Sequence, residues 1–243
     1  SGIITPSSVY ADKPIKYGSW SPKNYYNSFK GNVTIKHAVD ISINTVPVQV
    51  LEKLGVEQSY DFLTNKLGVT SLVENDKSMA ALALGGLTNG ISNMELTAAY
   101  CSFANKGVYN SPITYTKVLD NNDKVVLEKK PKSNVAMKST TASTMNGLLK
   151  SVCDVGTGTP AKFNSIYTIA GKTGTTDADK DRWFVGYTPY YCAAVWVGYD
   201  IPSPLTFYSV NPTIPLWREV MQRVHETKQL PAASFDSAII YAG

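Results

Sequence analysis

The spacing of apolar residues along the first third of the chain predicts helices. From Val33 to Leu54 the apolar positions recur every three to four residues, with an interruption at residues 42–44. Pro47 follows that interruption, in the first turn of a second helical run, where proline is tolerated. A further amphipathic helix is expected from Glu57 to Leu67. The pattern therefore predicts two helices with a break at Ser42, and a third helix after them.

Local signals mark the ends of two later helices. Ser92 precedes Glu95 by three residues, which is the spacing of a capping box, and Gly107 is typical of a helix end. A second helix is predicted from Thr140 to Val152, with Ser139 as its cap. The first of these helices is expected to run through Leu96, Tyr100 and Phe103.

Short apolar runs separated by turn residues predict strands. Ile113–Leu119 and Val125–Leu127, joined across a turn of Asp and Asn residues, indicate a hairpin. Tyr167–Thr173, Trp183–Tyr187 and Cys192–Tyr199 follow one another across short turns and predict an antiparallel meander.

The order of these segments predicts an α+β fold, because helices come first, then strands, then a closing amphipathic helix at Pro215–His225. The whole chain is expected to form one unit in four parts. Residues 1–32, rich in Pro, Tyr, Ser and Asn, are expected to be irregular; 33–110 form a helical subdomain; 111–227 hold the sheet and the closing helix; and 228–243 form a tail.

Composition narrows the class of protein. The 243 residues include 43% apolar residues and carry a net charge of +4, which suits a globular domain. The one dense basic run is interpreted as a solvated hairpin rather than a nucleic-acid site; it comprises Lys124, Lys129, Lys130 and Lys132. Three widely separated cysteines, without a C-x-x-C pair, indicate core residues rather than a disulfide framework or a zinc site. His225 is expected near a helix C-terminus, where a partial positive charge is favourable.

The sequence Lys172-Thr173-Gly174-Thr175 is the strongest chemical signal. A phosphate-binding loop is excluded because Ile166 stands where that motif needs glycine, and the G-x-G-x-x-A pattern at 156–161 lacks a surrounding βαβ unit. At the end of a strand, the lysine and the threonine are suited to bind a peptide carboxylate. The glycine lets an extended peptide approach the sheet edge.

Two serine-x-asparagine pairs occur, and their contexts differ. Ser42 and Asn44 lie at the predicted helix break and precede K-T-G, which suits a serine facing a cleft. Ser209 and Asn211 follow the sheet beside a proline, so an ordinary turn and cap explains them.

With these motifs the chain resembles the class A, bifunctional penicillin-binding proteins, whose motif order is S-x-x-K, S-x-N, K-T-G. The stretches at 83–112 and 170–200 resemble the family's segments, and the likeness extends from Ile3 to about His225. The resemblance implies a fold like that of the D,D-peptidases and serine β-lactamases, with an antiparallel sheet flanked by helices. It also implies a D,D-transpeptidase that cross-links peptidoglycan through an acyl-enzyme and that β-lactams inhibit covalently.

The chain departs from the family pattern at the nucleophile. No lysine has a serine three residues before it, so the S-x-x-K motif is missing. We expect the nucleophile, its lysine and the first-motif helix in an upstream segment, as a removed piece or a separate chain. The chain alone is then predicted to be inactive.

The family's residue roles transfer to the positions that match. Ser42 would relay a proton, Asn44 would bind the substrate amide, and Lys172 with Thr173 would hold the terminal carboxylate. Gly174 would let an extended peptide approach as an extra strand, and the backbone N–H of Thr175 would form part of the oxyanion hole. The expected ligands are stem peptides and β-lactams, without a cofactor, metal or nucleic acid.

Two alternatives remain open. A serine β-lactamase shares the motifs but needs a carboxylate for deacylation, usually in an E-x-x-L-N pattern that does not occur here. A non-catalytic peptide- or penicillin-binding module would also suit a chain without a nucleophile. The resemblance further implies a location on the extracytoplasmic face of the bacterial membrane. It also implies a membrane anchor and a glycosyltransferase domain in the intact protein, and residues 1–243 show neither of them.

Overall fold

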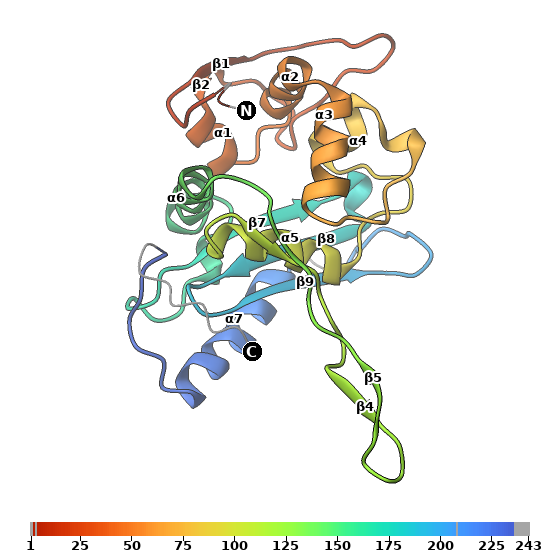
Figure 1. The fold of residues 1–243 in the computed structure, drawn as a ribbon. Coiled ribbons are helices and arrows are strands. Elements are labelled where there is room, and N and C mark those ends of the chain that lie inside the picture. The colour runs from red at the N-terminus through yellow and green to blue at the C-terminus, as the bar shows by residue number, and fades with distance from the viewer. Residues whose placement is uncertain (1, 3, 208, 236–243) are drawn as a thin grey trace.

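A three-stranded antiparallel sheet organises the C-terminal half of the chain (Figure 1). The computed structural model describes residues 2, 4–207 and 209–235. Strands β7 (Ala170–Thr175), β8 (Asp181–Tyr187) and β9 (Cys192–Gly198) lie in that order with one-to-one register. The predicted meander is confirmed. K-T-G lies at the end of its strand as predicted, but β7 spans Ala170–Thr175, so the strand begins and ends later than the predicted Tyr167–Thr173.

Helices cover both faces of this sheet. Helices α5 (Asn93–Ala104) and α6 (Ser139–Val155) lie on one side and α7 (Thr213–Thr227) lies on the other (Figure 1). Side chains of β8 alternate between the two layers, as a strand requires. Phe184 packs with Trp217 of α7, whereas Tyr187 packs with Leu149 of α6. The α+β class with an antiparallel sheet between helices is therefore confirmed.

The N-terminal part holds a strand pair and two helices. Its elements are β1 (Val9–Asp12), β2 (Gly31–Thr34), α1 (Ile35–Asp40) and α2 (Thr45–Leu54). The helix break at residues 41–44 is confirmed, but Val33 lies in β2 and not in a helix. Thr34 ends the strand because its hydroxyl accepts a hydrogen bond from His37 N and caps α1. Residues 1–32, which were expected to be irregular, therefore include β1 and the start of β2, and the pairing of these strands fixes the ends of the 12–30 segment.

Short elements complete the chain. They are α3 (Val56–Asp61), the π-helix η1 (Phe62–Lys66), the 3-10 turns η2 (Glu74–Asp76), η3 (Thr159–Ala161) and η4 (Asp177–Asp179), α4 (Met79–Leu84), and the strand pairs β3 (Val108–Asn110) with β6 (Ser133–Val135) and β4 (Lys117–Leu119) with β5 (Val125–Glu128). The Ser92–Glu95 capping box is confirmed. The predicted Ser139 cap is wrong, because Lys138 precedes the first turn of α6 without a side-chain cap.

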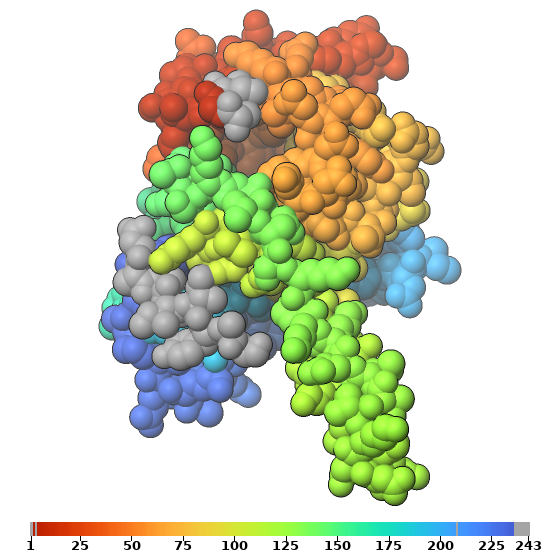
Figure 2. All heavy atoms as spheres, in the orientation of Figure 1, coloured from red at the N-terminus to blue at the C-terminus, as the bar shows by residue number. Residues whose placement is uncertain are grey.

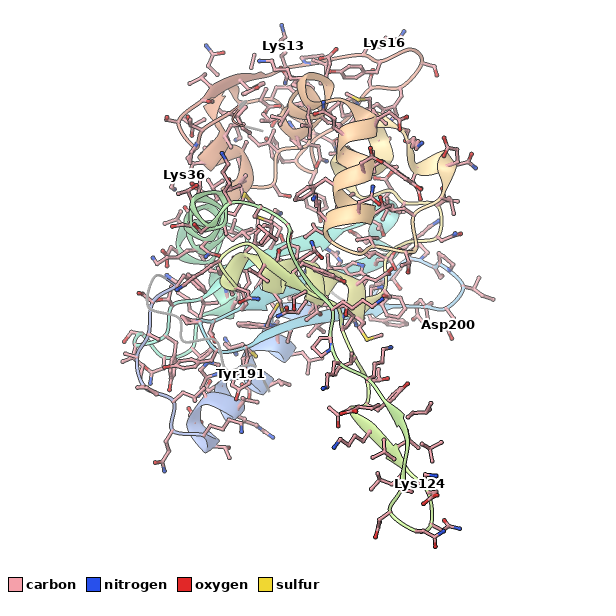
Figure 3. All side chains as sticks on the ribbon, viewed as in Figure 1. Lys13, Lys16, Lys36, Lys124, Tyr191 and Asp200 are labelled. Atoms are coloured by element: carbon pink, nitrogen blue, oxygen red, sulfur yellow. The ribbon has the colours of Figure 1, made fainter. Side chains whose placement is uncertain are left out.

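The hairpin β4–β5 projects from the body of the molecule (Figure 2). Its four predicted lysines are exposed, as a solvated hairpin requires. Lys124 lies at its tip, while Lys13 and Lys16 lie at the opposite end of the molecule (Figure 3). The lysine at the hairpin tip is therefore far from Lys13 and Lys16 in this view.

Buried residues test the remaining core predictions. Cys153 is fully buried and all three cysteines are free thiols, which agrees with core residues. His225 lies in the last turn of α7, but it is fully buried, and desolvation lowers its pKa. The expectation of a favourable positive charge there is wrong, because burial favours the neutral ring. No helix among the described residues is long and apolar enough to cross a membrane.

Candidate active site

The serine of the first S-x-N pair and the lysine of K-T-G meet in space. Lys172 Nζ donates a hydrogen bond to Ser42 Oγ at 2.8 Å, although the two residues are 130 positions apart in the chain. The same ammonium donates to the carbonyl oxygen of Thr173 at 3.0 Å. The structure thus brings two of the predicted site residues into direct contact.

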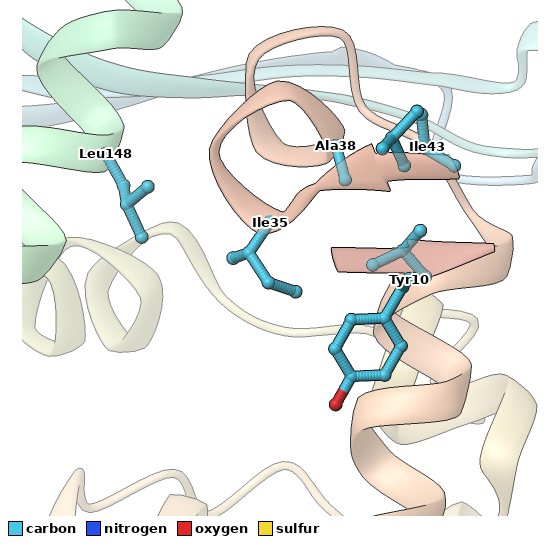
Figure 4. Close-up of a cluster of buried hydrophobic side chains, with 7 residues drawn as sticks. Tyr10, Ile35, Ala38, Ile43 and Leu148 are labelled. Atoms are coloured by element: carbon cyan, nitrogen blue, oxygen red, sulfur yellow. The ribbon is translucent and has the colours of Figure 1, made fainter. Parts of the chain in front are cut away.

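Ser42 is presented by a tight turn between α1 and α2. Its φ of 58° lies in the left-handed region, which costs a non-glycine residue about 1 kcal/mol. The next residue, Ile43, is 2% exposed and anchors the turn in a cluster with Tyr10, Ile35 and Leu148 (Figure 4). Burial of Ile43 therefore holds the serine in place against the strain.

Asn44 lies in the same turn, but its side chain is engaged elsewhere. Its Nδ2 donates to the carbonyl oxygen of Lys23 at 2.8 Å, and its backbone N–H donates to Asn24 Oδ1 at 2.9 Å. No hydrogen bond joins Asn44 to Lys172 in the described part of the chain. The structure thus places Asn44 beside Ser42 while its amide nitrogen binds the 12–30 segment.

Strand β7 is an edge strand, so half of its backbone groups face away from the sheet. Thr176 N donates to Asp181 O, which makes that pair a hydrogen-bonded one. Opposite pairs alternate along an antiparallel ladder, so the backbone of Thr175 and Thr173 points to the free edge. The bond from Lys172 Nζ to Thr173 O agrees with that direction. Gly174 keeps the strand close to Trp183, since an added Cβ would lie 3.1 Å from the Trp183 Cβ.

The glycine-containing loop after α6 also belongs to the site, and the sequence analysis missed it. Thr157 Oγ1 lies 2.8 Å from Thr173 Oγ1, and Thr157 N donates to the Asp40 carbonyl at 3.0 Å. Gly156 permits this approach, because a Cβ there would lie 2.2 Å from Asp40 O. The sequence signal for this loop is the G-x-G pattern at residues 156–158, which lacks the surrounding βαβ unit of a dinucleotide site.

The ammonium group of Lys172 is desolvated and has no anionic partner. Burial lowers the pKa of Lys172 to about 8. No carboxylate in the described part of the chain lies within ion-pairing distance of it. A ligand that carries a carboxylate would supply the missing charge and favour the protonated lysine.

Comparison with known protein families identifies the family of this chain. Residues 1–222 match the penicillin binding protein transpeptidase domain. The chain belongs to this family.

Relatives of the transpeptidase domain are found among class A proteins. The chain is 38% identical over 225 residues to penicillin-binding protein 1A of Clostridium acetobutylicum, covering 90% of this chain and 27% of that protein. It is 34% identical over 226 residues to penicillin-binding protein 4 of Bacillus subtilis, covering 93% of this chain and 36% of the relative. The predicted resemblance to class A penicillin-binding proteins is confirmed, and the chain spans about a third of these relatives' length.

Solved structures share the transpeptidase fold. Penicillin-binding protein 1A from Haemophilus influenzae superposes with a TM-score of 0.78 at 20% identity, over 95% of this chain and 41% of that one. The penicillin-binding protein PonA1 from Mycobacterium tuberculosis gives a TM-score of 0.77 at 21% identity, over 92% of this chain and 64% of that one. At such identities the likeness concerns the fold.

A large hollow of this transpeptidase-family chain lies apart from the Ser42–Lys172 pair. It has a volume of about 720 Å³ and lies in the loop between β9 and α7, where its lining includes Tyr199, Ile201 and Phe207. None of the residues predicted for the site lines it. The hollow and the candidate site are therefore separate features of the structure. Asn211 of the second S-x-N pair makes a local contact, because its Oδ1 accepts from Thr213 N at the start of α7.

Proposed function

We propose that the chain is the C-terminal portion of a peptidoglycan D,D-transpeptidase domain, in which Ser42, Lys172 and the edge of β7 form one side of the acylation site. The observation that carries this proposal is the Lys172–Ser42 contact at 2.8 Å, made by a desolvated ammonium without an anionic partner. Such a group is suited to bind the terminal carboxylate of a D-Ala-D-Ala stem peptide or of a β-lactam.

The proposed reaction needs a nucleophilic serine and its lysine from the upstream segment, whether in the same polypeptide or in a separate chain. That serine would attack the carbonyl of the penultimate D-alanine, form an ester and expel the last D-alanine as an amine. Ser42 would pass a proton to the leaving amine, and the hydrogen bond that Lys172 donates to the Ser42 hydroxyl supports this role. An amine of a second stem peptide would then attack the ester, releasing the serine and forming the cross-link.

Two further groups complete the proposed site. The outward-facing N–H of Thr175 would donate to the oxyanion of the tetrahedral intermediate, and the free edge of β7 would accept the substrate as an added strand. Asn44 would bind the substrate amide through its side-chain oxygen, because its nitrogen already donates to Lys23 O. On the same strand, Thr173 would hold the terminal carboxylate together with Lys172, and Gly174 would let the substrate peptide approach the sheet edge.

The setting follows from the relatives and is proposed with the function. We expect the intact protein to act on the extracytoplasmic face of the bacterial membrane, held there by an upstream anchor beside a glycosyltransferase domain. Stem peptides and β-lactams are its proposed ligands, without a metal or cofactor.

Covalent labelling tests the proposal. We expect fluorescent penicillin to label the protein that carries the upstream segment and to leave the 243-residue chain unlabelled. Labelling of the chain alone would contradict the inferred upstream position of the nucleophile. Rapid turnover of nitrocefin by the complete protein would identify a β-lactamase instead. Failure of the complete protein to be labelled would indicate a non-catalytic module.

The two S-x-N serines provide a matched pair of variants. In the complete protein, Ser42→Ala is expected to slow acylation by about 100-fold or more, because a proton relay is removed. Ser209→Ala makes the same chemical change at an exposed serine outside the site and is expected to stay within about twofold of wild type. Equal rates in the two variants would exclude Ser42 from the reaction.

A further inference from the structure

A buried carboxylate lies behind the Ser42 turn. Asp12, at the end of β1, is 1% exposed and accepts four hydrogen bonds. Its Oδ1 accepts from Asn24 Nδ2 at 2.8 Å and from Thr45 Oγ1 at 2.6 Å. Its Oδ2 accepts from Lys30 N at 2.8 Å and from the Tyr26 hydroxyl at 3.2 Å. These bonds fasten the 12–30 segment to the first residue of α2.

Asn24 connects Asp12 to the turn that contains Ser42 and Asn44. It is 3% exposed, and its Nδ2 binds both Asp12 and the Ser28 carbonyl. Its Oδ1 accepts the backbone N–H of Asn44 at 2.9 Å, while the neighbouring Lys23 carbonyl accepts the Asn44 side chain at 2.8 Å. Both nitrogens of Asn44 are therefore bound by a segment that itself contributes no proposed reacting group.

We infer that Asp12 and Asn24 are positioning residues, which hold the Ser42–Asn44 turn at the distance and angle that Lys172 requires. The reason is geometric. The Ser42 backbone is strained at φ 58°, so the turn keeps this shape only when contacts on its far side fix it. Ile43 fixes it by burial, and Asn24 fixes the next residue by a direct hydrogen bond. Because Asp12 orients Asn24, loss of either side chain releases the backbone N–H of Asn44 and allows Ser42 to move.

The inference rests on the proposed function, and the expected effect can be stated for acylation. A displacement of about 1 Å at a reacting group costs up to about 100-fold in rate. We expect Asp12→Asn and Asn24→Ala to lower the acylation rate constant of the complete protein by about 10- to 100-fold. The dissociation constant for the initial penicillin complex should change less than the rate constant, because Lys172 remains.

Asp76 provides a matched control for the loss of a buried carboxylate. It is fully buried and accepts three hydrogen bonds, from Val73 N at 2.9 Å and from the backbone and hydroxyl of Thr88 at 2.7 Å each. None of these partners belongs to the Ser42 turn. Asp76→Asn should therefore destabilise the fold as Asp12→Asn does, and leave acylation of the folded protein within about twofold of wild type.

The measurement is stopped-flow acylation by fluorescent penicillin, at a temperature where denaturation curves show each variant folded. Asn24→Ala retains the Asp12 carboxylate, so it serves if Asp12→Asn does not fold. Slow acylation in the Asp12 and Asn24 variants, with a normal rate in Asp76→Asn, supports the inference. Equal rates in Asn24→Ala and Asp76→Asn would overturn it.

A second readout separates this inference from the proposed function. The titration of Lys172 can be followed by NMR in the wild-type protein and in Asn24→Ala, whether or not the protein reacts with penicillin. We expect the titration midpoint to move in Asn24→Ala and to stay in place in Asp76→Asn. If the complete wild-type protein is not labelled, the proposed function fails, and an unmoved midpoint in Asn24→Ala would refute the positioning role as well.

Discussion

Substitution of Gly156 by alanine tests how tightly the loop after α6 closes on the site. The added Cβ would lie 2.2 Å from the Asp40 carbonyl oxygen, about 1.2 Å inside the 3.4 Å at which ordinary contact begins. The Cβ is fixed to Cα and the carbonyl oxygen is part of the backbone, so neither atom can rotate away. Relief of the overlap must therefore separate the loop from the end of α1.

The magnitude follows from the contacts that this separation affects. Overpacking of a close contact costs about 1–3 kcal/mol. The bonds from Thr157 to Asp40 O and to the Thr173 hydroxyl, at 3.0 and 2.8 Å, contribute about 1 kcal/mol each. Together these contributions predict that Gly156→Ala lowers the free energy of unfolding by about 3–5 kcal/mol.

Gly147 is the matched control, because it lies in α6, is exposed, and has no atom within 4 Å of an added Cβ. Gly147→Ala should raise the free energy of unfolding by about 0.5–1 kcal/mol through helix propensity. Urea denaturation followed by circular dichroism measures both variants. A Gly156→Ala variant as stable as Gly147→Ala would show that the loop does not pack against Asp40 as described.

Three further predictions concern titrating groups. NMR of isotopically labelled lysine should find one titration midpoint near 8, the pKa to which burial lowers Lys172, and this signal should disappear in Lys172→Arg. Burial lowers the pKa of His225, so its contribution to stability is complete above about pH 6.5 and is lost as the pH falls below it. His225→Phe should flatten this part of the stability–pH curve, and an unchanged slope would disprove the assignment. Hydrogen bonds from Thr70 and Ser92 lower the pKa of Glu95 to about 2 despite desolvation, so Glu95→Gln should remove stability that wild type loses between about pH 4.5 and 2 in acid denaturation.

The sequence predicted the elements that depend on local patterns. The break at Ser42 was visible because the apolar spacing fails there, and the meander was visible because short apolar runs alternate with turns. The capping box at Ser92 needs only residues three positions apart. Interactions of this range are encoded in adjacent residues, so their pattern can be read directly.

Contacts between residues far apart in the chain could not be predicted from the sequence. Asp12 and Asn24 lie in a segment without periodicity, and their role depends on a turn that begins well downstream of them. His225 occupies a helix end, where local electrostatics favours a positive charge, yet tertiary packing buries the ring against Tyr167 and Phe163. The desolvation that follows outweighs the local preference.

The separation of Ser42 and Lys172 along the chain also links binding to unfolding. Tertiary packing alone joins their two elements, so the complete site exists only while the helical and sheet halves remain docked. A molecule that binds both the Ser42 turn and β7 would stabilise the packing of these two halves against each other. It would raise the melting temperature in proportion to the logarithm of its concentration once it saturates the protein.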